Sequence, residues 1–444
     1  MRTNISFKHI NKLAIPALIA GISEPILSIT DTAIVGNIEV NGTESLAAVG
    51  IVGTFLSMLI WVLGQTRSAI SSIVSQYVGA DNLDAVKNLP AQAIFIITSL
   101  SILIIISTYP FAESIFKLYN ASDVILSYSV DYYRIRVFGF PFTLFTIAIF
   151  GTFRGLQNTY YPMLIAIVGA LTNILLDFIL VYGIEGYIPA MHIKGAAYAS
   201  VAAQFLMALV SAYFLLTKTE ISLRFSFPFN KEMKRFVLMI LNLFVRTLAL
   251  NVTLYLASSF STRYGNEQIA AYTIAINLWF LGAFIIDGYA SAGNILSGKL
   301  LGGKEYGLLI GLSNKLIKYG IIAGSIIAVI GAFLYFPLGT VFTKDPEVLK
   351  EFYNIFWIVL AMQPLCALAF IFDGIFKGLG KMKYLRNILL FSTFIVFVPV
   401  LLVLDYFNCK LYAIFIAFTL WIAARGLPLI VKFRKEFLLL SQKD

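Results

Sequence analysis

Twelve long apolar stretches follow one another along this chain of 444 residues, with short polar segments between them. A helix that crosses a bilayer needs about 20 mostly apolar residues. The composition agrees with membrane spans, because only 13% of the residues are charged, against about 25% in an ordinary soluble domain. The sequence therefore predicts an all-α membrane protein with twelve transmembrane helices, at 13–36, 46–77, 91–112, 125–152, 162–183, 195–217, 236–261, 269–299, 315–339, 350–376, 387–404 and 411–431.

Lysine and arginine gather near the N-terminus, in alternate loops and near the C-terminus. Positive residues beside membrane spans mark the cytoplasmic side, so we expect both termini in the cytoplasm, as in a multi-pass protein of a bacterial inner membrane. The first apolar stretch is too long for a signal-peptide core and lacks a small-residue cleavage site, so it is predicted to be retained.

The two halves of the chain repeat at one fixed offset. The segment LAAVGI at 46–51 returns as IAAYTI at 269–274, a shift of 223 positions (269 minus 46). At the same shift Gly79 meets Gly302, and GTFRGL at 151–156 meets GIFKGL at 374–379. Six spans are an even number, so the halves must be parallel and are predicted to be related by a pseudo-twofold axis. We expect two six-helix lobes, 1–217 and 236–444, joined by a basic cytoplasmic linker at 218–235.

Few residues here suit enzyme chemistry. The two cysteines, Cys366 and Cys409, and the two histidines, His9 and His192, form no zinc-type spacing or disulfide framework. A His-Glu-x-x-His segment is absent from the sequence, which argues against an intramembrane metalloprotease. Because the net charge of +10 comes from basic loops, it indicates topology and not a nucleic-acid partner. A twofold helical bundle without a cofactor favours a transporter over an enzyme.

Acidic and polar side chains interrupt the spans of the first half. Glu24 and Asp31 lie close to two helical turns apart and so share one face, and Asn173 and Asp177 are spaced i, i+4. With Ser200 in the next span, these oxygens would form a cage of the kind that hard cations such as Na⁺ prefer. The same carboxylates would instead take up H⁺ if burial raised their pKa, and a purely structural polar cluster is a third alternative.

The second half carries Asp287 and Asp373 inside predicted spans. Arg246 and Arg67, also within spans, are the natural counter-charges for them. These acids either couple an ion, line a substrate cavity or form local ion pairs. Leading into the fourth span, the segment 132–136 (YYRIR) favours an outer aromatic belt with arginines reaching for the interface, and a polar rim to the cavity is the alternative. Arg425, near Pro428, is expected to anchor the inner end of the last span.

Taken in order, these segments resemble the multidrug and toxic compound extrusion (MATE) transporters, in particular their DinF-type branch. The resemblance rests on Pro16, Pro25 and DTAIVG at 31–36, on QYVGA at 76–80, on GTFRGLQNT at 151–159, on Asn173 with Asp177, on GAAYAS at 195–200, and on Arg246, Asp287 and Asp373 with their neighbours. It covers essentially the whole chain.

The resemblance implies an antiporter that exports amphipathic, typically cationic small molecules against inward Na⁺ or H⁺. It places the coupling ion at Asp31, Asn173, Asp177, Ala196 and Ser200. Glu24 adds a carboxylate where this family usually has a neutral residue, and with Asp287, Asp373, Arg67 and Arg246 it is a candidate for the substrate cavity.

The partners that follow from these features are a small-molecule substrate and the lipid bilayer, and a monomer is expected. The alternative function is a lipid-linked oligosaccharide flippase of the same superfamily, which would need a cationic cavity for a diphosphate head group.

Overall fold

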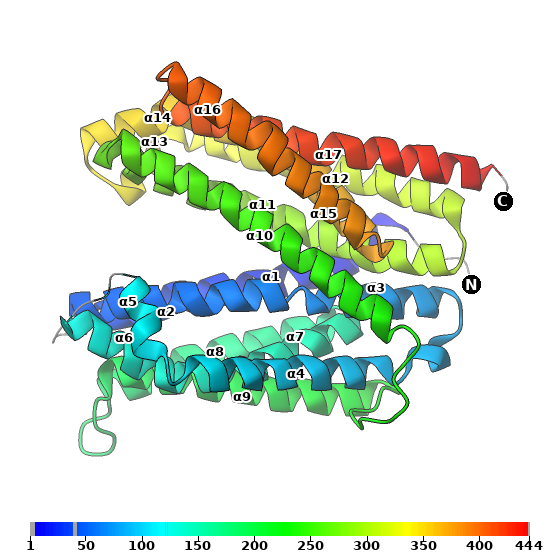
Figure 1. Cartoon of the computed structure of the whole chain (residues 1–444), viewed down its shortest axis with the longest axis horizontal. Coiled ribbons are helices and arrows are strands. Elements are labelled where there is room, and N and C mark those ends of the chain that lie inside the picture. The colour runs from blue at the N-terminus through cyan, green and yellow to red at the C-terminus, as the bar shows by residue number, and fades with distance from the viewer. Residues whose placement is uncertain (1–4, 39–41, 120, 122, 443–444) are drawn as a thin grey trace. The chain divides into compact units, whose positions relative to one another are not determined.

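The computed structural model describes residues 5–38, 42–119, 121 and 123–442, without the side chains of residues 23–29 and 123. These residues are helical apart from loops and one isolated bridge between Ile184 and Ile188 (Figure 1), which confirms the all-α class. The α-helices are α1 (Phe7–Gly36), α2 (Gly42–Leu63), α3 (Thr66–Gly79), α4 (Leu89–Thr108), α5 (Ala112–Leu118), α6 (Asp123–Arg136), α7 (Phe140–Gly155), α8 (Tyr160–Tyr182), α9 (His192–Lys218), α10 (Met233–Tyr264), α11 (Asn266–Gly302), α12 (Tyr306–Phe333), α13 (Tyr335–Phe342), α14 (Pro346–Gly378), α15 (Met382–Phe391), α16 (Val398–Tyr406) and α17 (Leu411–Ser441).

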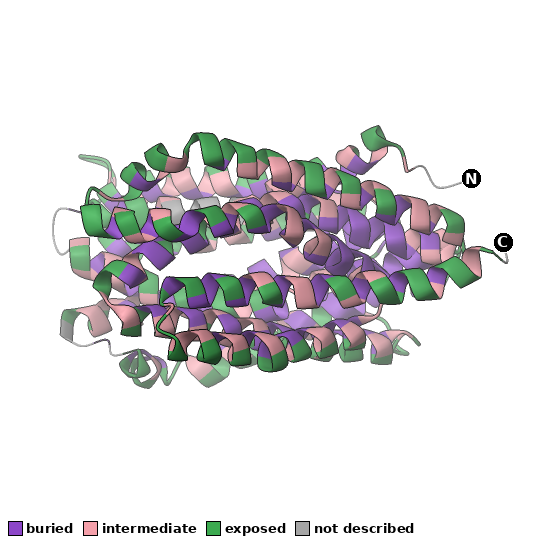
Figure 2. Cartoon of the chain, turned by 90° about the horizontal axis from the view of Figure 1, so that it is seen from above, coloured by how far each residue is buried: buried purple, intermediate pink, exposed green. Residues whose placement is uncertain are grey.

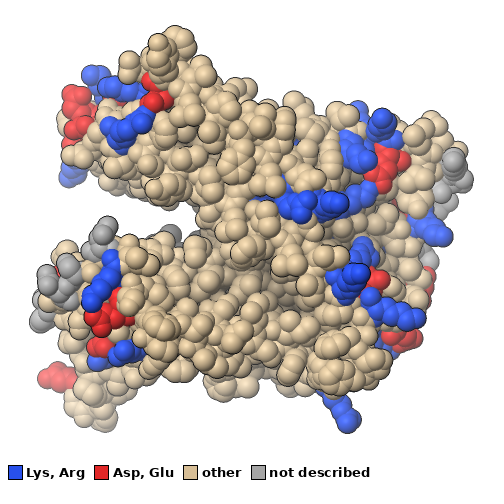
Figure 3. All heavy atoms as spheres, in the orientation of Figure 1, with Lys and Arg blue, Asp and Glu red and all other residues tan. Residues whose placement is uncertain are grey.

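Eleven helical stretches among the described residues are long and apolar enough to cross a membrane, and α1, with 30 residues, precedes them. Some spans combine two helices: α2 with α3, α6 with α7, and α15 with α16 through a π-helical segment at Ser392–Phe397. Each half of the chain thus holds six helices of spanning length, as the hydropathy pattern predicts. Charged side chains gather mainly toward the helix ends and leave a broad uncharged band between them (Figure 3).

The contacts of the chain form two compact units. One gathers the described residues of Met1–Leu18, Ser75–Asp81 and Val237–Asp444, and the other gathers Ile19–Val74 and Asn82–Phe236. Three helices, α1, α3 and α10, therefore contribute residues to both units. The lobe boundaries at 217 and 236 follow the sequence repeat and stay a prediction.

Apolar side chains fill the inside of each unit. In the unit that contains the C-terminal half, the fully buried Phe352, Phe356 and Trp421 belong to one continuous core. In the other unit, Phe116 and Tyr133 are fully buried in a smaller core. Buried residues lie on the inward faces of the helices and exposed residues on the outer faces (Figure 2). Large apolar side chains remain on those outer faces, as contact with lipid requires.

The inner end of α3 packs closely on α11 through glycines. A Cβ at Gly79 would lie 1.9 Å from the carbonyl oxygen of Lys299, and a Cβ at Gly302 would lie 1.8 Å from that of Gln76. The side chain of Gln76 also donates to the carbonyl oxygen of Gly378 at 2.7 Å. Small residues let helix backbones approach in this way. The contact explains why glycine stands at both of these repeat positions.

The predicted linker 218–235 is held against the unit of Ile19–Val74 and Asn82–Phe236. The Gln92 amide donates to the carbonyl oxygens of Ser226 and Pro228 at 2.7 and 3.1 Å. The Asn230 amide donates to the Asn88 side chain and to the carbonyl oxygen of Ala85 at 2.7 and 2.8 Å. The linker is therefore an ordered part of this unit and not a free tether.

The first described residues and the last helix both contact the first half of α12. Lys315 donates to the carbonyl oxygen of Ile5 at 3.1 Å, and the ring of Tyr306 lies 6.1 Å from that of Phe437. The start of α1 and the end of α17 therefore reach the same end of this unit (Figure 1). A chain with an even number of membrane spans begins and ends on the same side of the membrane, in agreement with this arrangement.

Candidate functional site

A buried group of polar side chains lies where α1, α8 and α9 meet. It contains Asp31 of α1, Asn173 and Asp177 of α8, and Ser200 of α9, and each is at least nine-tenths buried. Asp177 is completely inaccessible, at 0% exposure. All four residues belong to one compact unit, in helices of membrane-spanning length. We call this group the acid–amide cluster.

Asn173 stands at the centre of the acid–amide cluster. Its side-chain amide nitrogen donates to Asp31 Oδ1 at 2.7 Å and to Asp177 Oδ2 at 2.6 Å. The Ser200 hydroxyl donates to Asp31 Oδ2 at 3.3 Å. Three carboxylate oxygens thus accept from neutral donors. The fourth, Asp177 Oδ1, is buried and has no hydrogen-bond partner in the described part of the chain.

This geometry suits a small hard cation. Two buried carboxylates would carry two negative charges that neutral donors cannot cancel, and a buried charge without a counter-charge is strongly unfavourable. Oxygen atoms of carboxylates, amides and hydroxyls are the ligands that hard cations prefer. Protons on one or both acids would relieve the same charge. The cluster can therefore hold Na⁺ or H⁺ chemically.

Local sequence brings α8 and α9 close enough to build the cluster. A Cβ at Gly195 would lie 2.4 Å from the carbonyl oxygen of Leu180, so only glycine permits this approach. Ala196, Ala197 and Ala199 are fully buried beside it. Ala196 lies one turn before Ser200 on α9, which keeps both on the same face.

Three polar residues that the sequence pattern did not link to the acid–amide cluster lie around it. Tyr132 of α6 is 3% exposed, and the charges of Asp31, Asp177 and Arg136 act on its hydroxyl. Arg136 donates to Gln204 Oε1 at 2.8 Å. The i, i+4 spacing of Tyr132 and Arg136 indicates a shared helix face, but only the fold brings Gln204 to it.

The predicted outer aromatic belt at 132–136 is wrong. Tyr132 is almost fully buried, and Tyr133 is completely buried against Phe55 and Phe116. These rings pack inside the protein and do not face lipid. The alternating apolar and polar pattern of α6 could not distinguish an interface belt from a buried helix face.

The side chain of Glu24 lies outside the described residues, although the backbone of α1 is helical through this position. Its predicted role beside Asp31 therefore stays a prediction.

The unit that contains Val237–Asp444 holds a buried group of charges. Arg246 of α10 lies 2.5 Å from Asp373 Oδ1, and Lys377, one turn after Asp373 on α14, lies 2.9 Å from Oδ2. Arg246 and Asp373 are 6% and 8% exposed. This carboxylate is held by two cations and differs in this respect from the acids of the acid–amide cluster.

Two predicted site residues lack the ion pairs expected of them. Asp287 of α11 is exposed and forms no ion pair with a described side chain. Arg67 lies on α3 in the other unit, and among the described residues of that unit no acid pairs with it, while its Nε is buried without a hydrogen-bond partner. Sequence position alone does not show which way a helix turns each side chain.

Arg425 does not anchor the end of the last span. It is 4% exposed, and its guanidinium carbon lies 4.5 Å from the centre of the Trp421 ring and 5.5 Å from that of Phe370. The prediction failed because an arginine one turn before a proline near a helix end has the same pattern whether it faces lipid or the core.

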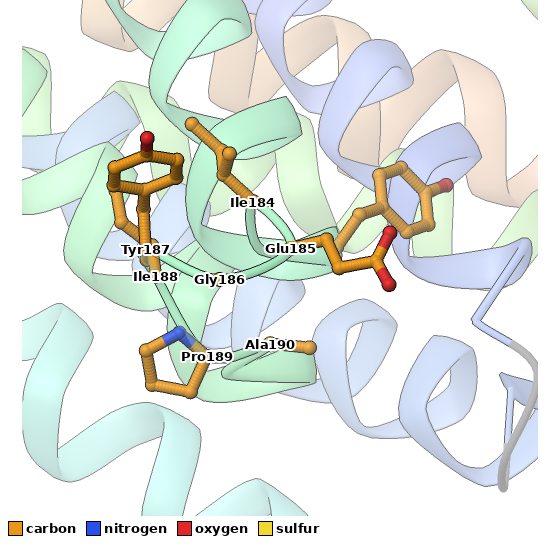
Figure 4. A pocket seen from close by; sticks show the side chains of 8 residues that line it. Ile184, Glu185, Gly186, Tyr187, Ile188, Pro189 and Ala190 are labelled. Atoms are coloured by element: carbon orange, nitrogen blue, oxygen red, sulfur yellow. The ribbon is translucent and has the colours of Figure 1, made fainter.

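A shallow hollow of about 490 Å³ lies on the loop between α8 and α9. It is lined by Tyr182 and by residues 184–190, with the carboxylate of Glu185 at its edge (Figure 4). The hollow contains none of the predicted site residues.

Known proteins resemble this chain over nearly its whole length. The MatE family model matches residues 16–179 and 243–403. The chain is 26% identical to Protein DETOXIFICATION 42 of Arabidopsis thaliana, covering 85% of this chain and 82% of the relative. It is 25% identical to DNA damage-inducible protein F of Escherichia coli, covering 97% and 93%.

A crystal structure of MATE in the bent conformation superposes with a TM-score of 0.90 at 20% sequence identity, covering 98% of this chain and 96% of the other. The two-lobe, twelve-helix fold expected from the sequence is thus the fold of solved MATE structures. The family model covers both halves of the chain and both helices that carry the acid–amide cluster's acids. This protein therefore belongs to the MatE family and is an integral, multi-pass membrane transporter, not an enzyme.

Proposed function

We propose that the protein is an antiporter that exports amphipathic small molecules, with cationic molecules as the expected class, in exchange for inward movement of Na⁺ or H⁺. It would act by alternating access as a monomer in a bacterial inner membrane, with both termini in the cytoplasm. The positions of lysine and arginine in the loops support this orientation. The common position of the two chain ends beside α12 is consistent with it.

The acid–amide cluster is the observation that carries the coupling. It is buried among helices of spanning length, holds two carboxylates, and leaves Asp177 Oδ1 without a partner in the described part of the chain. A cation bound there would complete the coordination of this oxygen and cancel part of the negative charge. One positive charge that moves inward across 100 mV releases about 2.3 kcal/mol. That energy is available to drive export when ion and substrate occupy the protein in turn.

Membership of the MatE family supports export of toxic small molecules, and one relative is named for detoxification. The comparisons do not favour the lipid-linked oligosaccharide flippase. Asp287 and Glu24 remain candidates for contact with a cationic substrate, since Asp287 is exposed on a helix of spanning length.

The test is efflux of a fluorescent cationic dye from proteoliposomes, with a Na⁺ gradient and a pH gradient imposed separately. Wild type should respond to one of the gradients, and Asp31→Asn should abolish that response. Asp84→Asn is the matched control, because the Asp84 side chain is 83% exposed in a short helical turn outside the cluster. If Asp31→Asn transports as well as wild type, the acid–amide cluster is structural and the coupling proposal fails.

A further inference from the structure

One face of α14 is polar through the core of its unit. Four polar residues recur on α14 at intervals of three to seven positions, which places them on one side of the helix: Gln363, Cys366, Asp373 and Lys377. Gln363 and Cys366 are 1% and 0% exposed. The Oε1 atom of Gln363 has no hydrogen-bond partner in the described part of the chain. A core that served only for packing would not carry this polar stripe.

Among the described residues, three cations and a single acid lie around the Asp373–Lys377 end of this polar face. Asp373 accepts from Arg246 and Lys377, as described above. Lys377 also lies in the last turn of α14, where the helix dipole favours a positive charge. These two cations are therefore compensated. Arg425 of α17 is near enough for the charges of Arg246 and Asp373 to act on it, yet it forms no ion pair or hydrogen bond with any described residue.

Ring contacts give Arg425 neither a counter-charge nor a hydrogen-bond acceptor in the plane of its guanidinium. The guanidinium packs on the rings of Trp421 and Phe370, which attract a cation through their faces. A buried charge without a counter-charge is strongly unfavourable. The guanidinium also presents five N–H donors, which need acceptors when water is excluded. Asp373 is the single acid among the described residues around Arg425, and it already accepts from Arg246 and Lys377.

We propose that Arg425 binds the carboxylate of an amphipathic ligand between α10, α14 and α17. The guanidinium fork matches the two oxygens of a carboxylate, and Trp421 and Phe370 offer apolar surface to the ligand's body. Arg246 and Lys377 add positive potential nearby. This proposal rests on the proposed export function for the ligand's being the transported molecule, and it differs from that function in the class of substrate. Such a ligand is an amphipathic acid or zwitterion, whereas the family resemblance implies a cation.

Binding can be measured on the full chain in detergent, without any gradient. The probes are benzoate, inorganic phosphate and chloride as sodium salts at equal ionic strength, and the readouts are ligand-dependent thermal stabilisation and quenching of tryptophan fluorescence, to which Trp421 contributes. Benzoate should stabilise wild type. Arg425→Met fills the space between the rings without a charge and should weaken benzoate binding at least about tenfold, while Arg425→Lys should retain part of it. Arg434→Gln, an exposed arginine on the same helix, is the control and should bind as wild type does.

Three outcomes would overturn the carboxylate site: no benzoate binding by wild type, equal binding by wild type and Arg425→Met, or stabilisation by phosphate alone. Failure of the export function gives a different result. In that case benzoate still binds in an Arg425-dependent manner, but neither gradient drives efflux of any substrate from proteoliposomes.

Discussion

Asn173 and Asp31 lie 142 positions apart in the sequence, and the amide nitrogen of the first donates to Oδ1 of the second at 2.7 Å. Because the same amide also reaches Asp177, Asn173 is the only donor in the described cluster that contacts both acids. It fixes the spacing of the two carboxylates. A change at this residue therefore tests the geometry of the cluster without removing a charge.

Asn173→Leu should abolish ion-driven efflux. The leucine leaves Asp31 and Asp177 buried without their shared donor, and a buried acceptor that loses its partner is destabilised by about 1–3 kcal/mol. Dye efflux in proteoliposomes and ion-dependent thermal stability measure the effect. Asn387→Leu, at an exposed position on α15, should behave as wild type. Gradient-driven efflux that persists in Asn173→Leu would contradict the assigned geometry.

Ser200 should contribute through its hydroxyl and not through its size. Ser200→Ala removes the donor to Asp31 Oδ2, and a hydrogen bond to a charged group contributes about 1.5–3 kcal/mol. The apparent affinity for the coupling ion should fall about tenfold, measured as the ion concentration that gives half-maximal efflux. Ser200→Thr keeps the hydroxyl and should restore it. Equal affinities for the alanine and threonine variants would assign Ser200 a packing role.

Removing the acid between Arg246 and Lys377 should destabilise the protein strongly. Asp373→Leu leaves the buried Arg246 and the half-buried Lys377 without their partner, and breaking a buried pair in this way costs about 3–5 kcal/mol. Thermal unfolding in detergent should show a large decrease in stability. The double variant Asp373→Leu with Arg246→Met should recover much of the loss, because it removes the unpaired arginine as well. A single variant as stable as wild type would mean that water or lipid already compensates these cations.

The glycine contact between α3 and α11 should not tolerate a methyl group. At Gly79 or Gly302 an alanine Cβ would lie under 2 Å from a backbone oxygen, so the helices must separate, and overpacking of this kind costs about 1–3 kcal/mol. Gly307→Ala is the control, because nothing lies within 4 Å of its Cβ position. It should leave stability equal or slightly higher, since alanine favours helix. Thermal unfolding of the three variants, side by side, measures the difference.

Much of this architecture could be predicted from the sequence, because hydrophobic length is set by the bilayer. The spans, their number in each half and the stacking of Asn173 on Asp177 follow from apolar runs and helical spacing. The neighbours of the acid–amide cluster could not be predicted, since Gln204 reaches Arg136 only through the packing of α9 on α6. Asp287 and Asp373 look alike in sequence, yet one is exposed and the other is buried between two cations. Helix rotation decides this difference, and hydropathy does not encode it.

The contact of α3 with α11 is also reciprocal. In the sequence repeat, position 76 corresponds to 299 and position 79 to 302. Gly79 approaches the backbone of Lys299, and Gly302 approaches that of Gln76. The same two repeat positions therefore make the contact on both sides. Reciprocity of this kind defines an isologous interface, which joins identical subunits around a twofold axis. At this contact the two repeats of one chain meet as the two subunits of a homodimer meet. In a dimer of a six-helix ancestor, the same helix from each copy would have formed both sides of the contact.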